Sequence, residues 1–119
     1  MATFTETRHT GEHLVSEANG SRSRAEGELA AGNLPAGAVL ALNGDGNYVQ
    51  LAPGASDGTE SAVGVLYAST NASDEAARCV IHVRDCEVHG EALTWPSGIT
   101  ETQKNTAITD LASAGIIVR

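Results

Sequence analysis

Two cysteines and two histidines lie close together in the chain, and these residue types could bind a metal ion. Thiolates and imidazoles are the ligands that zinc prefers in proteins. The surrounding residues, however, alternate between apolar and polar types as in a β-strand, which places Cys79 and His82 on opposite faces. We therefore expect no metal, and a metal-binding regulator that uses His82 and Cys86 is only a third hypothesis. The four residues are Cys79, His82, Cys86 and His89.

Two other patterns could indicate a cation site, but neither carries enough ligands. His9 and His13 lie four residues apart, which brings two imidazoles together only on a helix, and Gly11 between them disfavours a helix. Residues 43–47 contain Asp45 as their only carboxylate, whereas calcium loops need several at regular spacing. We interpret residues 43–47 as a turn.

The same cysteines are predicted to remain free thiols. In one continuous strand Cys79 and Cys86 would lie about 23 Å apart. A hairpin that turns at residues 84–85 would pair Cys86 with Val83 instead. Neither arrangement brings the two Cα atoms within the roughly 7 Å that a disulfide requires.

The sequence contains no catalytic signature. It has no G-x-S-x-G motif, no phosphate-binding loop, no Rossmann fingerprint and no H-E-x-x-H motif. Carboxylates such as Asp74 and Glu75 fall in a polar segment and are interpreted as solvated. We expect neither an enzyme nor a cofactor.

Length and charge narrow the class of protein further. A chain of 119 residues is expected to form one domain with a modest core. A net charge of −8, with seven scattered basic residues, argues against nucleic acid as a ligand. No apolar run is long enough for a membrane span, and the first residues do not resemble a signal peptide, so the chain is expected to stay in the compartment where it is made.

The elements that would position these residues are mostly short strands. Residues 38–42 and 48–52 flank the turn at 43–47 and predict a hairpin. Residues 61–68 and 77–83 predict two more strands, and 85–88 predicts a partner or a continuation of the latter. Gly64 indicates a bulge or a close approach of another backbone. Residues 21–24 are interpreted as a solvated basic loop, and 25–33 carry little signal.

The last third of the chain predicts the one helix. Pro96 favours an extended Trp95, Thr100 is a good N-cap residue, and Gln103 three positions later completes a capping box. The apolar face of the helix is predicted at Ala107, Ile108, Leu111 and Ala112. Gly115 is predicted to end the helix in a left-handed conformation, before a short terminal strand.

Together these elements predict an α+β class: a β-rich compact domain of short antiparallel strands with one C-terminal helix and an extended N-terminal arm. Residues 1–12 are polar and without period, and we expect them to be a flexible arm. Residues 13–119 are expected to form the single domain. Residues 3–7 alternate and could add a strand to the sheet of a partner.

The order of several segments carries a resemblance that covers nearly the whole chain. The Leu-Thr-Trp-Pro run, the helix that follows with Gln-Lys, and the terminal Ile-Ile-Val are its main elements. With the upstream segments, the chain resembles the head decoration proteins of tailed phages, the family of phage lambda decoration protein D. The segments are residues 14–20, 23–24, 34–40, 63–67, 93–96, 103–104 and 116–118.

This resemblance implies a structural function. It implies a homotrimer on the outer surface of the expanded phage head at three-fold positions, bound to the major capsid protein, which cements the shell against DNA pressure. It implies no nucleic acid and no membrane as partners. The location would be the virion, after synthesis in the host cytoplasm.

The resemblance also directs attention to two groups of residues. The arm, Thr3, Phe4, Thr5, Glu6 and Thr7, is expected to bind the capsid. Trp95, Pro96 and Ile99 are expected to form the trimer or capsid-facing base, or simply core. The alternative function is a small β-rich glycan-binding module, in which Trp95 and Tyr48 or Tyr67 would stack on sugar rings.

Overall fold

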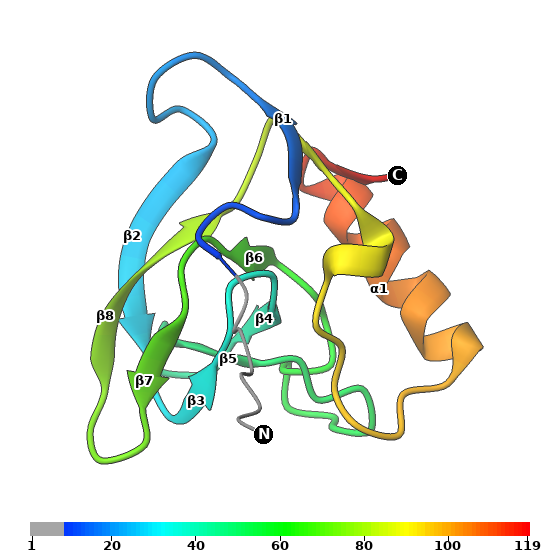
Figure 1. Cartoon of the computed structure of the whole chain (residues 1–119). Coiled ribbons are helices and arrows are strands. Elements are labelled where there is room, and N and C mark those ends of the chain that lie inside the picture. Colours follow the sequence, from blue (N-terminus) through cyan, green and yellow to red (C-terminus); the bar gives the residue numbers. More distant parts are fainter. Residues whose placement is uncertain (1–8) are drawn as a thin grey trace, which may run out of the picture.

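A five-stranded closed barrel forms the larger part of the molecule in the computed structural model, which describes residues 9–119 (Figure 1). The strands follow the order β2-β5-β4-β6-β8, and the pairing of β2 with β8 closes the barrel. The β-rich fold with one C-terminal helix was predicted, whereas the closure was not. The strands are β2 (Arg24–Leu29), β4 (Val39–Leu42), β5 (Tyr48–Gln50), β6 (Gly64–Leu66) and β8 (Ala77–His82).

The pairing confirms the predicted hairpin. Strands β4 and β5 are antiparallel, with Leu40 opposite Gln50 and Leu42 opposite Tyr48. The side chain of Asn43 accepts hydrogen bonds from the backbone N–H groups of Asp45 and Asn47, which stabilises the turn. Alternate residues of the barrel strands point inward and are fully buried, as the period of a strand requires. They are Leu29, Leu40, Leu66 and Ile81.

Gly64 lies where the barrel wall allows no side chain, which confirms the predicted close approach. A Cβ atom at this position would lie 2.6 Å from Ile81 Cγ2 and 2.9 Å from the backbone oxygen of His82. Gly64→Ala is therefore expected to lower the free energy of unfolding by about 1–3 kcal/mol, as overpacking does. Chemical denaturation would measure this, with Gly44→Ala as control, since no atom lies within 4 Å of that position. Equal stability of the two variants would contradict the packing argument.

A second sheet and the helix build the other side of the molecule. The sheet has the order β1-β9-β10, with β1 antiparallel and β10 parallel to β9. The helix α1 (Glu101–Ser113) packs beside β10 (Figure 1). A two-stranded sheet, β3-β7, extends from the barrel, and a short 3-10 helix, η1, precedes the segment at Trp95. Their bounds are β1 (Leu14–Glu17), β3 (Gly32–Leu34), β7 (Thr70–Ala72), β9 (Cys86–Val88), η1 (Gly90–Ala92) and β10 (Ile116–Val118).

The ends of α1 form as predicted. The backbone N–H of Gln103 donates to Thr100 Oγ1 at 3.1 Å, and the backbone N–H of Thr100 donates to Gln103 Oε1 at 3.0 Å. Gly115 follows the helix with φ +89°, the left-handed conformation. The buried face is narrower than predicted. Ala107 and Leu111 are buried, but Ala112 is exposed, because the helix contacts its neighbours along one i, i+4 stripe only.

The segment at 85–88 corrects the sequence interpretation. Asp85, with φ +51°, turns the chain out of the barrel, so β9 neither continues β8 nor pairs with it. Cys86 of β9 instead pairs with Ile116 and Glu17 in the second sheet. Cys79 and Cys86 are both buried free thiols, which confirms that prediction.

The segment at 21–33 was also misinterpreted. Residues 24–29 form one of the two longest strands, although their sequence gave little signal. Ser23 is fully buried, where its hydroxyl donates to the backbone oxygen of Asp85 and accepts from the N–H of Ala18. The predicted solvated basic loop is therefore wrong for Ser23 and for Arg24, which binds the carboxylate of Glu17.

In the part of the chain that the structure describes, no helix is long and apolar enough to cross a membrane.

Candidate interaction surfaces

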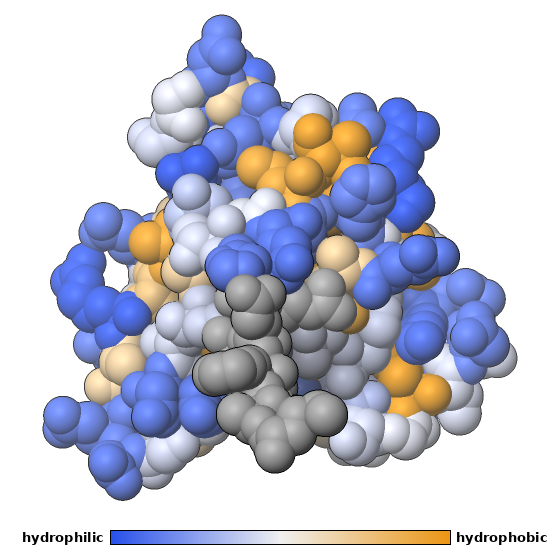
Figure 2. Space-filling view, viewed as in Figure 1, coloured by the Kyte–Doolittle hydropathy of each residue, from blue (hydrophilic) through white to orange (hydrophobic). Residues whose placement is uncertain are grey.

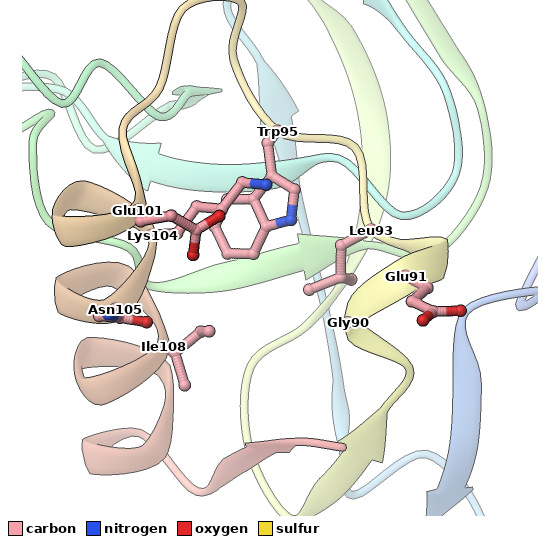
Figure 3. Close-up of a pocket in the computed structure, with 8 residues that line it drawn as sticks. All are labelled: Gly90, Glu91, Leu93, Trp95, Glu101, Lys104, Asn105 and Ile108. Atoms are coloured by element: carbon pink, nitrogen blue, oxygen red, sulfur yellow. The ribbon is translucent and has the colours of Figure 1, made fainter.

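Trp95 lies at a groove between η1 and α1. The segment after η1 carries Leu93 into the core, and Trp95 then packs against the edge of the same apolar cluster while staying partly exposed. Figure 3 shows the indole between this segment and the first turns of α1. Lys104 lies over the ring, with its Nζ 5.8 Å from the ring centroid. Trp95 is thus both a support of the core and part of the surface.

The groove is small, open and mixed in character. Its volume is about 310 Å³. Apolar side chains from both sides form its floor, and Glu91 and Glu101 place carboxylates on opposite sides of it (Figure 3). A partly exposed tryptophan with an apolar floor and a charged rim is typical of residues that contribute strongly to protein–protein contacts. The lining residues are Gly90, Glu91, Leu93, Trp95, Glu101, Lys104, Asn105 and Ile108.

The other residues of the predicted base lie beside the groove, not in it. Pro96 and Ile99 are partly exposed and belong to the turn that connects Trp95 to α1, in which the N–H of Ile99 donates to the oxygen of Pro96 at 3.3 Å. Ile99 also packs against the apolar cluster under Trp95. The arm residues, Thr3, Phe4, Thr5, Glu6 and Thr7, lie outside the described residues.

A second exposed apolar area lies on the β1-β9-β10 sheet, and sequence reasoning missed it. Val15 of β1 and Ile117 of β10 are 42% and 41% exposed. They flank β9, where Glu87 pairs with Ile117 in register and with the side chain of Arg119 at 2.8 Å. Figure 2 shows hydrophobic residues gathered over this part of the face. The short terminal strand was predicted, but its place at a sheet edge beside β9 depends on pairing that no local pattern reports.

The tyrosines of the glycan hypothesis do not line the groove at Trp95. The ring of Tyr48 is half-buried and lies over Gly27, where an added Cβ atom would be 2.6 Å from Tyr48 Cε2. Burial raises the pKa of Tyr48. The ring of Tyr67 contacts the guanidinium of Arg24 at 4.1 Å and the ring of His82 at 5.2 Å. Among the residues that the structure describes, no second aromatic ring therefore lines the groove beside Trp95.

The four residues of the metal hypothesis lie in different surroundings. His82 is fully buried and contacts His13 and Glu17, whereas His89 is exposed. Burial raises the pKa of Cys86 to about 11, so its thiol is protonated at neutral pH. Among residues 9–119, no group of three histidine, cysteine or acidic side chains is placed to hold a metal ion.

The comparison with known families decides the identity. Residues 3–116 match the family described as bacteriophage lambda head decoration protein D. The chain belongs to this family. The match includes both the segment at 3–7 and the groove at Trp95, and it confirms the resemblance seen in the sequence. No individual curated protein matches the chain.

Membership in the decoration protein family sets the general function. The chain is a structural component of a phage head, and its location is the virion capsid. The family is structural, which agrees with surfaces suited to contacts with other proteins. Among the described residues, two such surfaces are the groove at Trp95 and the exposed apolar area on the β1-β9-β10 sheet.

Proposed function

We propose that the chain decorates the expanded phage head as a trimer, on its outer surface at three-fold positions, and cements neighbouring major capsid subunits. The family match across residues 3–116 carries this proposal. Trimers at these positions contact several capsid subunits at once. Their binding energy then resists the separation of subunits under the pressure of packaged DNA.

The properties of the chain support this function. A net charge of −8 suits a surface that faces solvent rather than the packaged genome. Three linked attachment points convert weak single contacts into lasting ones, since linkage adds roughly 10²–10⁴ in avidity. No tyrosine or tryptophan among the described residues is fully buried, so the apolar core of a single chain is modest. Contacts between copies would bury further apolar surface.

We assign the attachment to two parts of the chain. Residues 3–7 form the capsid-binding arm, whose alternating Thr, Phe and Glu side chains suit the addition of a strand to a capsid sheet. Trp95, Pro96 and Ile99 form the base that faces the neighbouring copy or the capsid. The half-buried state of these three side chains fits a surface that is completed on assembly.

Co-sedimentation with empty heads tests the proposal. The full chain is mixed with purified heads of the matching phage, before and after expansion, and bound chain is quantified per head. We expect saturation at a multiple of three copies on expanded heads and little binding before expansion. Expanded heads that carry the chain should also survive heating or osmotic shock better than bare heads. Absence of binding to expanded heads would overturn the proposal.

A further inference from the structure

A buried polar cluster joins the segment before β1 to the barrel. His13 and His82 are 1% and 0% exposed, and their rings meet edge-on with centroids 5.3 Å apart. The Nε2 atom of His13 lies 3.2 Å from Nδ1 of His82. On its other side, Nε2 of His82 lies 2.8 Å from Oε2 of Glu17. His82 is the last residue of β8. His13 directly precedes β1, and Glu17 is the last residue of β1, so the imidazole of His82 connects β8 to both ends of β1.

Other charged and titratable side chains of the described residues lie around the cluster and determine which of its groups are ionised. Arg24 of β2 donates from Nε and Nη2 to the two oxygens of Glu17, and its guanidinium lies over the ring of Tyr67. Tyr67, after β6, meets the ring of His82 edge-on. Cys86 of β9 pairs with Glu17 in register, and its raised pKa keeps it neutral. The neighbouring Asp85 forms an ion pair with Arg22 at 3.3 Å.

These contacts define the direction of each hydrogen bond. The carboxylate of Glu17 can only accept, so Nε2 of His82 donates to it. In a neutral imidazole the other nitrogen is an acceptor, so Nδ1 of His82 receives the Nε2–H of His13. This arrangement needs Nδ1 of His82 to be free of a proton, so the His82 ring must be neutral. A proton on His82 would place two N–H groups face to face unless His13 changes tautomer, and protonation of both rings would leave two cations 3.2 Å apart.

We propose that His13, His82 and Glu17 form an acid-sensitive latch, which holds the turn before β1 on the barrel at neutral pH and releases it as the pH falls. The turn is also held by backbone hydrogen bonds from Gly11 to Tyr67 and from His89 to His13, at 2.9 and 2.8 Å. Because this segment precedes β1, the latch sets how firmly residues 9–13 are held on the folded body. The inference concerns the chain alone and does not depend on capsid binding.

The sign of the pH effect follows from the burial of His82. Burial lowers the pKa of His82 below its ordinary value, despite the opposing hydrogen bond to Glu17. A lowered histidine pKa stabilises the latched state fully above the unfolded value of about 6.5, and this stabilisation is lost as the pH falls below it. The Arg24 hydrogen bond lowers the pKa of Glu17, so Glu17 stays ionised throughout this window. Between pH 7.5 and 5.5 the titration of His82 therefore dominates the pH dependence of the latch.

Hydrogen exchange of the full chain at several pH values tests the latch. After correction for intrinsic rates, the amides of Gly11 and His89 are expected to lose protection by up to about tenfold between pH 7.5 and 5.5, since tenfold is the limit for one histidine that stays neutral in the latched state one pH unit below its unfolded value. The amide of Leu66, which donates to Ala38 inside the barrel, is expected to stay unchanged. Equal changes at Gly11 and Leu66, or no change at Gly11, would overturn the proposal.

Two further measurements keep the test decisive. In an NMR titration of the unmodified chain, the ring of His82 should titrate below the ordinary histidine value of about 6.5, and titration of His82 at or above that value would contradict the latch. His82→Gln should remove the pH dependence of Gly11 exchange, whereas the control His89→Gln should keep it. If His82→Gln does not fold, the NMR titration and the exchange data on the unmodified chain are sufficient to test the latch.

Discussion

Removal of residues 1–8 is expected to lower the affinity of the chain for expanded heads by at least about 100-fold, because each copy of the proposed trimer would lose its proposed attachment arm. The shortened chain begins at His9, so it keeps Gly11, whose backbone N–H donates to Tyr67 at 2.9 Å. The folded body should therefore be intact. Co-sedimentation with expanded heads measures the binding, and thermal unfolding checks that the midpoint is unchanged.

Single substitutions can separate the role of the arm sequence from its length. If residues 3–7 bind as a strand, as proposed, alternation would put Phe4 and Glu6 on one face and Thr3, Thr5 and Thr7 on the other. Phe4→Ala should reproduce most of the loss, since an aromatic anchor contributes more than a threonine. Thr5→Ala is the matched control and should bind nearly as well as the unmodified chain. Full binding by the chain that begins at His9 would refute the assignment of the arm.

Trp95→Ala is expected to have the second large effect, on both stability and binding. The indole packs against the edge of a core cluster. Because it is partly buried, we expect its removal to lower the free energy of unfolding by about 1–3 kcal/mol. As an interface anchor it should also lower head binding roughly tenfold for each copy. In the proposed trimer three copies would bind together, so the loss of affinity for the whole particle should be larger.

The two roles of Trp95 can be separated by comparing binding at a temperature where the variants are fully folded. Trp95→Phe should recover most of the stability but less of the binding, because it keeps an apolar ring and loses the indole area. Leu42→Ala is the control: Leu42 is also exposed, at 38%, but does not line the groove. If folded Trp95→Ala binds heads as well as Leu42→Ala does, Trp95 is only a core residue and the base must lie elsewhere.

Local signals explain what the sequence predicted well. The capping box at Thr100 and Gln103, the left-handed Gly115 and the hairpin around Asn43 each depend on residues within four positions of one another. Their geometry is therefore decided by nearby atoms. The close approach at Gly64 was also predictable, because a glycine inside an apolar strand indicates that another backbone or side chain lies close to it.

Long-range pairing explains what the sequence could not predict. Strand β2 carries Glu26, Gly27 and Glu28, and it forms because it lies opposite β8, where Arg78 pairs with Glu26 at 2.8 Å. The two strands are about fifty positions apart, so no local pattern reports their contact. The transfer of β9 to a second sheet likewise depends on β1 and β10.

The buried cluster at His82 could not be predicted for the same reason, since its members come from distant parts of the sequence. Alternation placed His82 on the face opposite Cys79 and Ile81, but it gave no sign of what covers that face. It is fully buried because β1 lies over that face and supplies Glu17, 65 positions away. Similarly, the groove at Trp95 joins residues before and within α1, and the sequence indicated only its aromatic member.

The most direct test of the account is a three-dimensional image reconstruction of expanded heads, from the matching phage, saturated with the full chain. The account predicts three copies around each three-fold position on the outer surface, with residues 3–7 on the capsid protein and the Trp95 groove at a contact between copies or with the shell. Density for single copies away from these positions, or a bare outer surface under saturating conditions, would contradict it.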